Sequence, residues 1–282
     1  MLQRARATVH LRPARERDLP HVVRTLTLAF GEPLRGDTWQ WILESSEGVI
    51  FVAERRGEII GTGAGLRFGA TGWIGGLGVE PASRRRGIGS RLTGQVVDWL
   101  REHGARTLLL QATAQGQPVY EHLGFVADGA YRMWTVPPSR RTRRPDGHRG
   151  LRPLRAADLD AVLALDRAVT GEDRSLAVRG AWASGGYVLQ EDDRLRGYHL
   201  HTPWGPGPTV AADPEAGLAL LDAAQRPDES VRIGIPDINT AAARAMAKRG
   251  YEEVAGTQRM RLGPAVKWRP DLVFGVFNPF WG

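Results

Sequence analysis

Two segments of the chain, one near the start of each half, have similar sequences. The sequence LRPARERDLPHVVRTLTLAF begins at Leu11, and LRPLRAADLDAVLALDRAVT begins at Leu151. Each segment has the pattern of a short strand followed by a helix, and each continues through a second helix to a pair of strands, in residues 49–66 and 187–201. A repeat of this length predicts two halves with similar folds.

A stretch of arginine, proline and glycine, residues 137–150, separates the two copies. We interpret it as a linker between a domain of residues 1–136 and a domain of residues 151–282. Its basic run, RRTRR from Arg140, fits a solvated linker better than an RNA-binding patch, because no aromatic residue is interleaved for base stacking.

The most distinctive motif of the first half runs from Leu77 to Ser90, with the sequence LGVEPASRRRGIGS. An apolar strand leads into an arginine cluster, then Gly-Ile-Gly, then an amphipathic helix. The apolar positions of that helix are Ile88, Leu92, Val96, Trp99 and Leu100. Gly87 and Gly89 therefore fall where the helix begins, and there the free amides and the helix dipole favour an anion.

Three arginines precede these glycines. Arg84, Arg85 and Arg86 add positive charge and forked donors suited to phosphate oxygens. A tight turn from strand to helix would also use glycine for steric reasons alone. The motif is neither the dinucleotide fingerprint Gly-x-Gly-x-x-Gly nor a P-loop, because no Gly-Lys-Ser/Thr follows.

The motif resembles motif A of the GNAT acetyltransferases, Arg/Gln-x-x-Gly-x-Gly/Ala, matched here by Arg84, Gly87 and Gly89. The resemblance implies that the loop amides bind the pyrophosphate of acetyl-CoA, and that the preceding strand pairs through its backbone with the pantetheine arm. It implies no metal. The implied cofactor-binding residues are Leu77, Gly78, Val79, Arg84, Arg85, Arg86, Gly87, Ile88, Gly89 and Ser90.

A second stretch, LLLQATAQGQPVYEHLGF from Leu108, fits the same family as a strand, a short helix and a turn. GNAT enzymes commonly carry a tyrosine four residues before such a Gly-Phe, and here it is Tyr120. The resemblance implies that Tyr120 protonates the leaving CoA thiolate, since a phenol and an alkyl thiol have similar pKa values. A core tyrosine is the alternative. The family's asparagine seven residues earlier is Thr113 here, which puts a cofactor contact from that side chain in doubt.

The second half lacks both features. Where the first half has RRRGIG, it has AADPEAG from Ala211, with acidic residues that would repel a pyrophosphate. Aligning the closing turns EHLGF and AKRGY places Met246 opposite Tyr120 and Asn239 opposite Thr113. We therefore predict that the second domain has lost CoA binding.

With its ending LVFGVFNPFWG, the arrangement is similar to tandem GNAT proteins of the YitH-like group. The resemblance implies an α/β fold class, a tandem GNAT fold. Each half is then expected to have a mixed, mostly antiparallel central sheet flanked by helices.

Composition limits the function classes. The 282 residues carry a formal net charge of +7, with 36 arginines and 2 lysines, a skew that points to base composition of the gene more than to a nucleic-acid site. The absence of cysteine excludes disulfides and a cysteine nucleophile. We see neither a signal peptide nor a stretch long enough to span a membrane, and expect a cytoplasmic protein without nucleic-acid or membrane partners.

The resemblance implies that a primary amine, expected to be a small molecule, attacks the thioester of acetyl-CoA directly. The general base stays open among Glu80, His199, His201, Asp213 and a chain of waters; the two histidines also fit a polar strand face. Alternatives are a non-catalytic acyl-CoA-binding sensor or scaffold and a nucleic-acid-associated protein. Three aromatic residues line the acceptor pocket or belong to the core: Phe30, Trp39 and Trp41.

Overall fold

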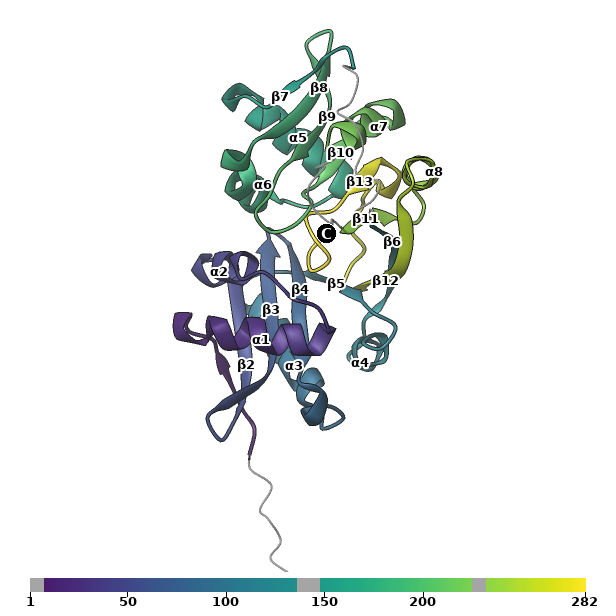
Figure 1. Ribbon diagram of the computed structural model, residues 1–282. Helices are drawn as coiled ribbons and strands as arrows, with labels where there is room; N and C mark the ends of the chain where they lie inside the picture. Colours follow the sequence, from purple (N-terminus) through teal and green to yellow (C-terminus); the bar gives the residue numbers. More distant parts are fainter. Residues whose placement is uncertain (1–7, 136–147, 225–231) are drawn as a thin grey trace, which may run out of the picture.

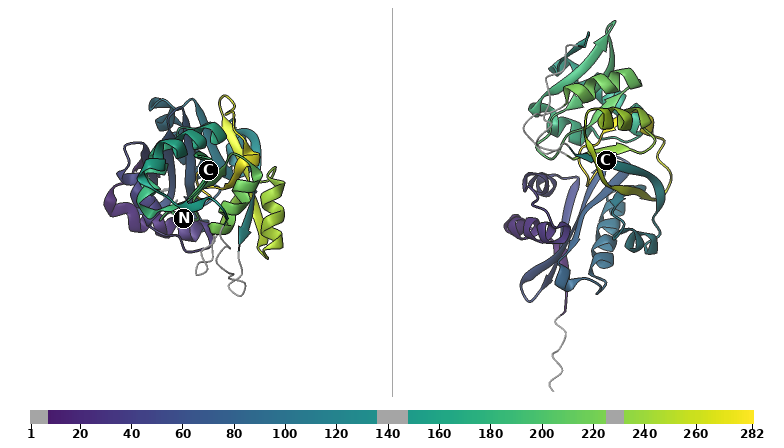
Figure 2. Two further views of the ribbon diagram at one scale, coloured as in Figure 1. Left: turned by 90° about the horizontal axis from the view of Figure 1, so that it is seen from above. Right: turned by 45° about the vertical axis from the view of Figure 1, so that its right-hand side comes forward.

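The computed structural model describes residues 8–135, 148–224 and 232–282 (Figure 1). Most of the expected linker, residues 137–150, lies outside this described part of the chain. Figures 1 and 2 show two halves stacked end to end, the first half (residues 8–135) from purple to blue and the second half (residues 148–282) from teal to yellow.

The elements follow the same order in both halves, except that the second half ends with an additional strand, β13. The helices are α1 (Leu19–Phe30), α2 (Asp37–Glu44), α3 (Ile88–Glu102), α4 (Gln117–His122), α5 (Leu159–Thr170), α6 (Ser175–Ala181), α7 (Pro214–Ala223) and α8 (Thr240–Lys248). The strands are β1 (His10–Pro13), β2 (Gly48–Arg55), β3 (Glu58–Phe68), β4 (Thr71–Val79), β5 (Thr107–Ala112), β6 (Val126–Thr135), β7 (Leu151–Pro153), β8 (Gly186–Glu191), β9 (Arg194–Leu200), β10 (Thr209–Ala211), β11 (Arg232–Pro236), β12 (Glu252–Leu262) and β13 (Val273–Gly275). Helix and strand order thus confirms the repeat.

The duplicated opening has a physical basis. In the first copy Arg12 donates to the carboxylate of Asp18, and Asp18 also accepts from the backbone amide of Arg15 at 2.8 Å. In the second copy Arg152 donates to Asp158, which accepts from the Arg155 amide at 2.7 Å. Both carboxylates have lowered pKa values, chiefly because of the hydrogen bond from the arginine. The repeated Arg and Asp therefore fix the same strand-to-helix corner twice.

The two halves exchange strands. The larger sheet has the order β1-β2-β3-β4-β5-β12-β6-β11, so β12 of the second half lies between β5 and β6 of the first. In turn β6 lies between β12 and β11 of the second half. The smaller sheet has the order β13-β10-β9-β8-β7. The α/β fold class, with mixed and mostly antiparallel sheets flanked by helices, is confirmed, and the exchange adds a feature that the repeat alone did not predict.

Helices cover both faces of the first half's sheet (Figure 1). On one face α3 packs on β3, where a Cβ at Gly61 would lie 3.1 Å from Leu92. On the other face α1 packs on β4, where a Cβ at Gly78 would lie 2.9 Å from Ala29. The buried side of α3 consists of the predicted apolar positions, of which Ile88, Leu92, Val96 and Leu100 are buried and Trp99 is partly buried. Among the described helices, none is long and apolar enough to cross a membrane.

Candidate active site

The central feature of the first half is the point at which β4 and β5 separate. The two strands pair in parallel only from Thr71↔Thr107 to Ile74↔Leu110. Beyond Ile74, residues 75–79 of β4 keep β3 as their neighbour on one side, and none of the described strands pairs with them on the other. Free backbone groups on that side can pair with an extended ligand.

The part of β4 that pairs with β3 alone, residues 75–79, contains the predicted residues Leu77, Gly78 and Val79. Its register against β3 shifts between Thr62↔Gly78 and Ala64↔Gly75, and Gly76 in this bulge has φ +56°. A left-handed φ of this kind favours glycine. The bulge turns the strand at the place where its partner β5 departs.

The strand leads to the start of α3. Gly87 is the N-cap with φ +74°, and the first helical hydrogen bond runs from the Arg91 amide to the Gly87 carbonyl at 3.1 Å. The amides of Ile88, Gly89 and Ser90 precede that bond, and in the described part of the chain they donate to no protein acceptor. The predicted position of Gly87 and Gly89 at the opening of the helix is confirmed.

Glycine is found at positions 87 and 89 for different reasons. The left-handed φ of Gly87 accounts for that residue by sterics alone. Gly89 is helical, and a Cβ there would meet no protein atom within 4 Å, so neither conformation nor packing requires glycine. Open space in front of free helix amides is what a pyrophosphate group needs, and these residues therefore fit the phosphate part of CoA.

The three arginines do not share one role. Arg84 donates from Nε to the Val79 carbonyl at 3.0 Å and from Nη2 to the Ala29 carbonyl at 2.7 Å, which ties the loop to β4 and α1. Arg85 and Arg86 are exposed, and Arg85 has φ +59°. Arg84 thus positions the loop from inside, and the exposed pair is left to supply charge to an anion.

Tyr120 lies in α4 on the α3 side of the sheet, 6.0 Å from Phe125 between ring centroids. It is buried, and burial raises the pKa of its hydroxyl above the ordinary value of 10.0. Because its pKa is raised, the phenol keeps its proton at neutral pH, and within the described residues its hydroxyl makes no hydrogen bond that would compete with a ligand. Thr113, by contrast, uses its hydroxyl to accept from the Gly116 amide at 3.3 Å, at the turn before α4.

The candidate bases are engaged elsewhere. Glu80 pairs with Arg24 at 3.1 Å. Asp213 caps α7 by accepting from the Ala216 amide at 3.0 Å and also binds Arg196. Burial alone would raise the pKa of Asp213, but the hydrogen bonds from Arg196 and the Ala216 amide, together with the charge of Arg196, outweigh burial and lower the pKa.

The paired histidines stay within the second half. His199 contacts Thr209 Oγ1 through Nδ1 at 2.9 Å and lies edge-on to His201 at 5.1 Å. Both rings therefore lie on one face of β9 and its extension, within the second half.

The second half fills the space that corresponds to this candidate site of the first half. Strand β10 corresponds to β4, and β13 pairs with its free side through Thr209↔Gly275 and Val210↔Val273. A Cβ at Gly217 of α7 would lie 2.1 Å from the ring of Phe274, which is fully buried. A protein strand and a phenyl ring thus occupy the space beside β10, while Asp213 occupies the helix start.

The second half also reaches β4. Glu172 accepts hydrogen bonds from Thr71 Oγ1 at 2.7 Å and from Trp73 Nε1 at 2.8 Å. The segment after β13 returns to the first half, where Phe280 lies against Gly75. The sequence alone assigns neither residue a role, because Glu172 follows the end of a predicted helix and the ending LVFGVFNPFWG indicates only the resemblance.

The three aromatic candidates of the first half have different places. Trp39 is buried beneath Phe280, with ring centroids 5.1 Å apart. Phe30 is 39% exposed. Trp41 stacks on Trp204 of the second half at 4.1 Å, so it serves the contact between the halves.

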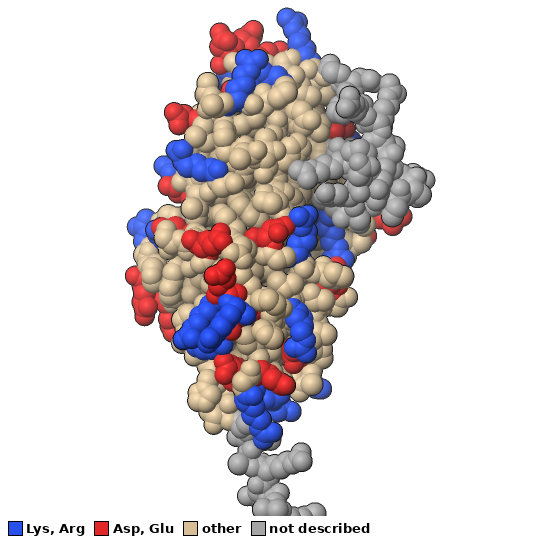
Figure 3. Space-filling view, turned by 60° about the vertical axis from the view of Figure 1, so that its left-hand side comes forward, with Lys and Arg blue, Asp and Glu red and all other residues tan. Residues whose placement is uncertain are grey.

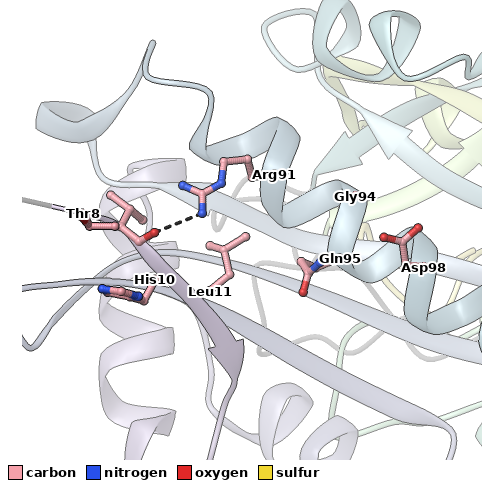
Figure 4. A pocket seen from close by; sticks show the side chains of 8 residues that line it. Thr8, His10, Leu11, Arg91, Gly94, Gln95 and Asp98 are labelled. Carbon is pink, nitrogen blue, oxygen red and sulfur yellow. Dashed lines mark hydrogen bonds between the residues drawn. The ribbon is translucent and has the colours of Figure 1, made fainter.

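A separate open groove lies along the exposed side of α3 beside β1 (Figure 4). Arg91 spans it and donates to the Val9 carbonyl at 3.1 Å, so this arginine faces away from the helix start. Gly94, Gln95 and Asp98 line the groove on the helix side. Across the described residues, no group of histidine and carboxylate side chains is arranged to hold a metal ion.

Comparison with known proteins agrees with this geometry. The acetyltransferase (GNAT) family matches residues 18–125, and the acetyltransferase (GNAT) domain matches residues 162–275. A putative acetyltransferase from Pyrococcus horikoshii is similar in structure, with a TM-score of 0.83, 23% identity, and coverage of 97% of this chain and 96% of that chain. No curated protein matches significantly.

Two further solved structures share the arrangement. A GCN5-related N-acetyltransferase from Sphaerobacter thermophilus has a TM-score of 0.65 at 15% identity, covering 93% of this chain and 98% of its own. A tandem GNAT protein from the clavulanic acid biosynthesis pathway has a TM-score of 0.59 at 16% identity, covering 92% and 100%. At these identities the likeness concerns the fold, and the narrower resemblance to the YitH-like group stays a prediction. The two family matches place the chain in the GNAT family, as an acyltransferase with two GNAT domains in tandem.

Proposed function

We propose that the first half transfers an acetyl group from acetyl-CoA to a primary amine of a small molecule. One observation carries the proposal: β4 loses its neighbour β5 after Ile74, and the same strand leads to the open amides at the start of α3. An extended ligand with a pyrophosphate at one end would satisfy both features at once.

The residues of this chain would divide the work as follows. The amides of Ile88, Gly89 and Ser90 bind the pyrophosphate, with Arg85 and Arg86 nearby to compensate its charge. The free backbone of β4, residues 75–79, aligns the pantetheine arm, and its amides can polarise the carbonyl oxygen of the thioester. Acetyl-CoA supplies the activated acetyl group.

The amine nitrogen forms a bond to the acetyl carbon and gives up one proton to solvent water, and the bond from that carbon to sulfur breaks. The electron pair leaves with the sulfur, and Tyr120 then donates its proton to this thiolate. Burial raises the pKa of Tyr120, which keeps the hydroxyl protonated until the sulfur develops charge.

The face of the molecule drawn in Figure 3 supports a small-molecule partner over a nucleic acid. On the face drawn in Figure 3, lysine and arginine side chains are interspersed with aspartate and glutamate and form no continuous basic stripe. Nucleic-acid binding relies on such a stripe. A cytoplasmic location and independence from membranes and nucleic acids remain parts of this proposal.

Isothermal titration with acetyl-CoA tests the proposal. We expect one site per chain, since the second half fills its corresponding space with β13 and Phe274. Two sites would contradict the loss of binding in the second half, and no binding would contradict the proposed cradle. Turnover with a panel of amines then separates catalysis from the sensor alternative, which predicts binding without acetylation.

A further inference from the structure

The segment that follows β13 carries an aromatic residue onto the catalytic strand. Asn278 turns this segment by accepting from the amides of Phe280 at 2.8 Å and Trp281 at 3.2 Å through its Oδ1. A Cβ at Gly75 would lie 2.8 Å from the carbonyl oxygen and 2.9 Å from the Cβ of Phe280. Phe280 is therefore in direct contact with β4 on the side that faces α1 and α2.

The contact lies at the point where the strands separate. Gly75 is the first residue of β4 after Ile74, which is the last to pair with β5. If the pantetheine arm runs along β4 from the start of α3, its reactive end reaches this point. Phe280 then borders the space through which an acceptor approaches the thioester, on the face of the sheet opposite Tyr120.

Phe280 is part of an aromatic group with a buried and an open end. Its ring centroid lies 5.1 Å from that of Trp39, which is 1% exposed, and 5.8 Å from that of Phe30, which is 39% exposed. Phe280 itself is half-buried. Trp39 thus forms the buried side of the group, while Phe30 and Phe280 remain partly exposed beside β4.

The charged side chain nearest to Phe30 in sequence, Glu32, is neutralised by an ion pair. Glu32, two residues after Phe30, forms an ion pair with Arg232 of β11, with contacts of 2.8 and 2.9 Å. The pair joins the end of α1 to the second half. The surface beside the reactive end therefore offers aromatic rings rather than an uncompensated charge, which favours an apolar substituent on the acceptor.

We infer that Phe280, with Phe30, determines acceptor specificity and selects amines that carry an aromatic or bulky apolar group. The inference rests on the proposed acetyl transfer and deepens it by naming the substrate class. The second half thereby contributes to the acceptor site of the first through its C-terminal segment. Edge-to-face contact with a substrate ring would use the same geometry that these phenylalanines adopt with each other.

The test compares 2-phenylethylamine with ethylamine, which differ by one phenyl group. We expect the unaltered protein to favour 2-phenylethylamine by about tenfold or more in kcat/KM, since burying a hydrocarbon group of this size gives discrimination of at least that order. Phe30→Ala and Phe280→Ala should each lower this ratio by about tenfold, mainly through KM. Phe30→Ala is the safer variant for folding because its side chain is partly exposed.

Leu28→Ala is the matched control, because Leu28 lies on the same helix and is 44% exposed but has no place in the aromatic group. Its ratio should stay unchanged. Equal ratios in the unaltered protein and in both phenylalanine variants would overturn the inference.

A binding measurement separates this outcome from failure of the proposed function. If neither amine is acetylated, direct transfer to amines is wrong, but amine binding in the presence of CoA can still be followed by tryptophan fluorescence. Binding of 2-phenylethylamine, weakened at least tenfold in Phe30→Ala, would support the aromatic site. Binding no tighter than that of ethylamine would overturn it.

Discussion

Glu172 of the second half accepts a hydrogen bond from the indole Nε1 of Trp73, at 2.8 Å, and so anchors the second half on β4 of the first. The same carboxylate oxygen accepts from Thr71 Oγ1 at 2.7 Å. Glu172 is buried, and burial raises the pKa of its carboxyl above the ordinary value, although Arg174 and the two hydrogen bonds oppose the shift. The contact between the halves is therefore sensitive to protonation.

Substitution Glu172→Gln should change how stability depends on pH. Because the pKa of Glu172 is higher in the folded than in the unfolded chain, its contribution to stability is fully present below the unfolded pKa and is lost as pH rises through the folded pKa. Glutamine has no charge at any pH. The melting temperature of the unaltered protein should thus fall relative to that of Glu172→Gln as pH rises from 4.5, measured by thermal unfolding across a pH series.

Glu253→Gln serves as the control for this series. Glu253 is 46% exposed and pairs with Arg132 at 3.3 Å on the surface. Surface pairs contribute little to stability, so the difference in melting temperature should stay constant with pH. If the difference in melting temperature between the unaltered protein and Glu172→Gln also stayed constant with pH, folding would not raise the pKa of Glu172.

Local features of the sequence predicted the parts of the fold that depend on neighbouring residues. The spacing of Ile88, Leu92 and Val96 gave the buried side of α3, and Gly87 and Gly89 gave its start. The two Arg-Asp corners of the repeat also depend on residues six apart in the chain. Such interactions need no information about distant segments.

Features that depend on pairing between distant segments were not predicted. Strand β12 has the pattern of an ordinary sixth strand of the second half, and nothing in it indicates that β5 of the first half is its neighbour. In the sequence, Phe274 and Phe280 are both apolar residues of one segment and cannot be told apart. In the structure, Phe274 fills the space beside β10, whereas Phe280 lies on β4. Tertiary context alone separates these roles.

Because the two halves exchange strands, we expect them to stay associated after the linker between them is cleaved. Cleavage at a protease site inserted in the linker, residues 137–150, should leave two fragments that elute together, because β12 is hydrogen-bonded to β5 and β6, and β6 to β11. They should also unfold in one transition, since removal of either fragment would leave strand edges unpaired. Size-exclusion chromatography and calorimetry measure both. Separate elution under native conditions would contradict the strand order.

Tyr120→Phe should lower kcat by about a hundredfold, the usual effect of losing a general acid, while acetyl-CoA affinity is kept. Stability should change little, because the hydroxyl makes no hydrogen bond within the described protein that could be lost. Since burial raises the pKa of Tyr120, its deprotonation should cause no fall in rate up to about pH 10. Tyr251→Phe, in the second half, is the control and should turn over normally. Equal rates in both variants would remove Tyr120 from the mechanism.

Two glycines of α3 allow a matched test of the phosphate cradle. Gly89 and Gly94 lie in the same helix, and a Cβ at either would meet no protein atom within 4 Å. Leucine at either position should leave the protein as stable or slightly more stable, because leucine favours a helix over glycine by about 0.5–1 kcal/mol. Only Gly89→Leu places a side chain before the free amides, so it should weaken acetyl-CoA binding at least tenfold, as measured by isothermal titration. Equal affinities in the two variants would mean that the pyrophosphate binds elsewhere.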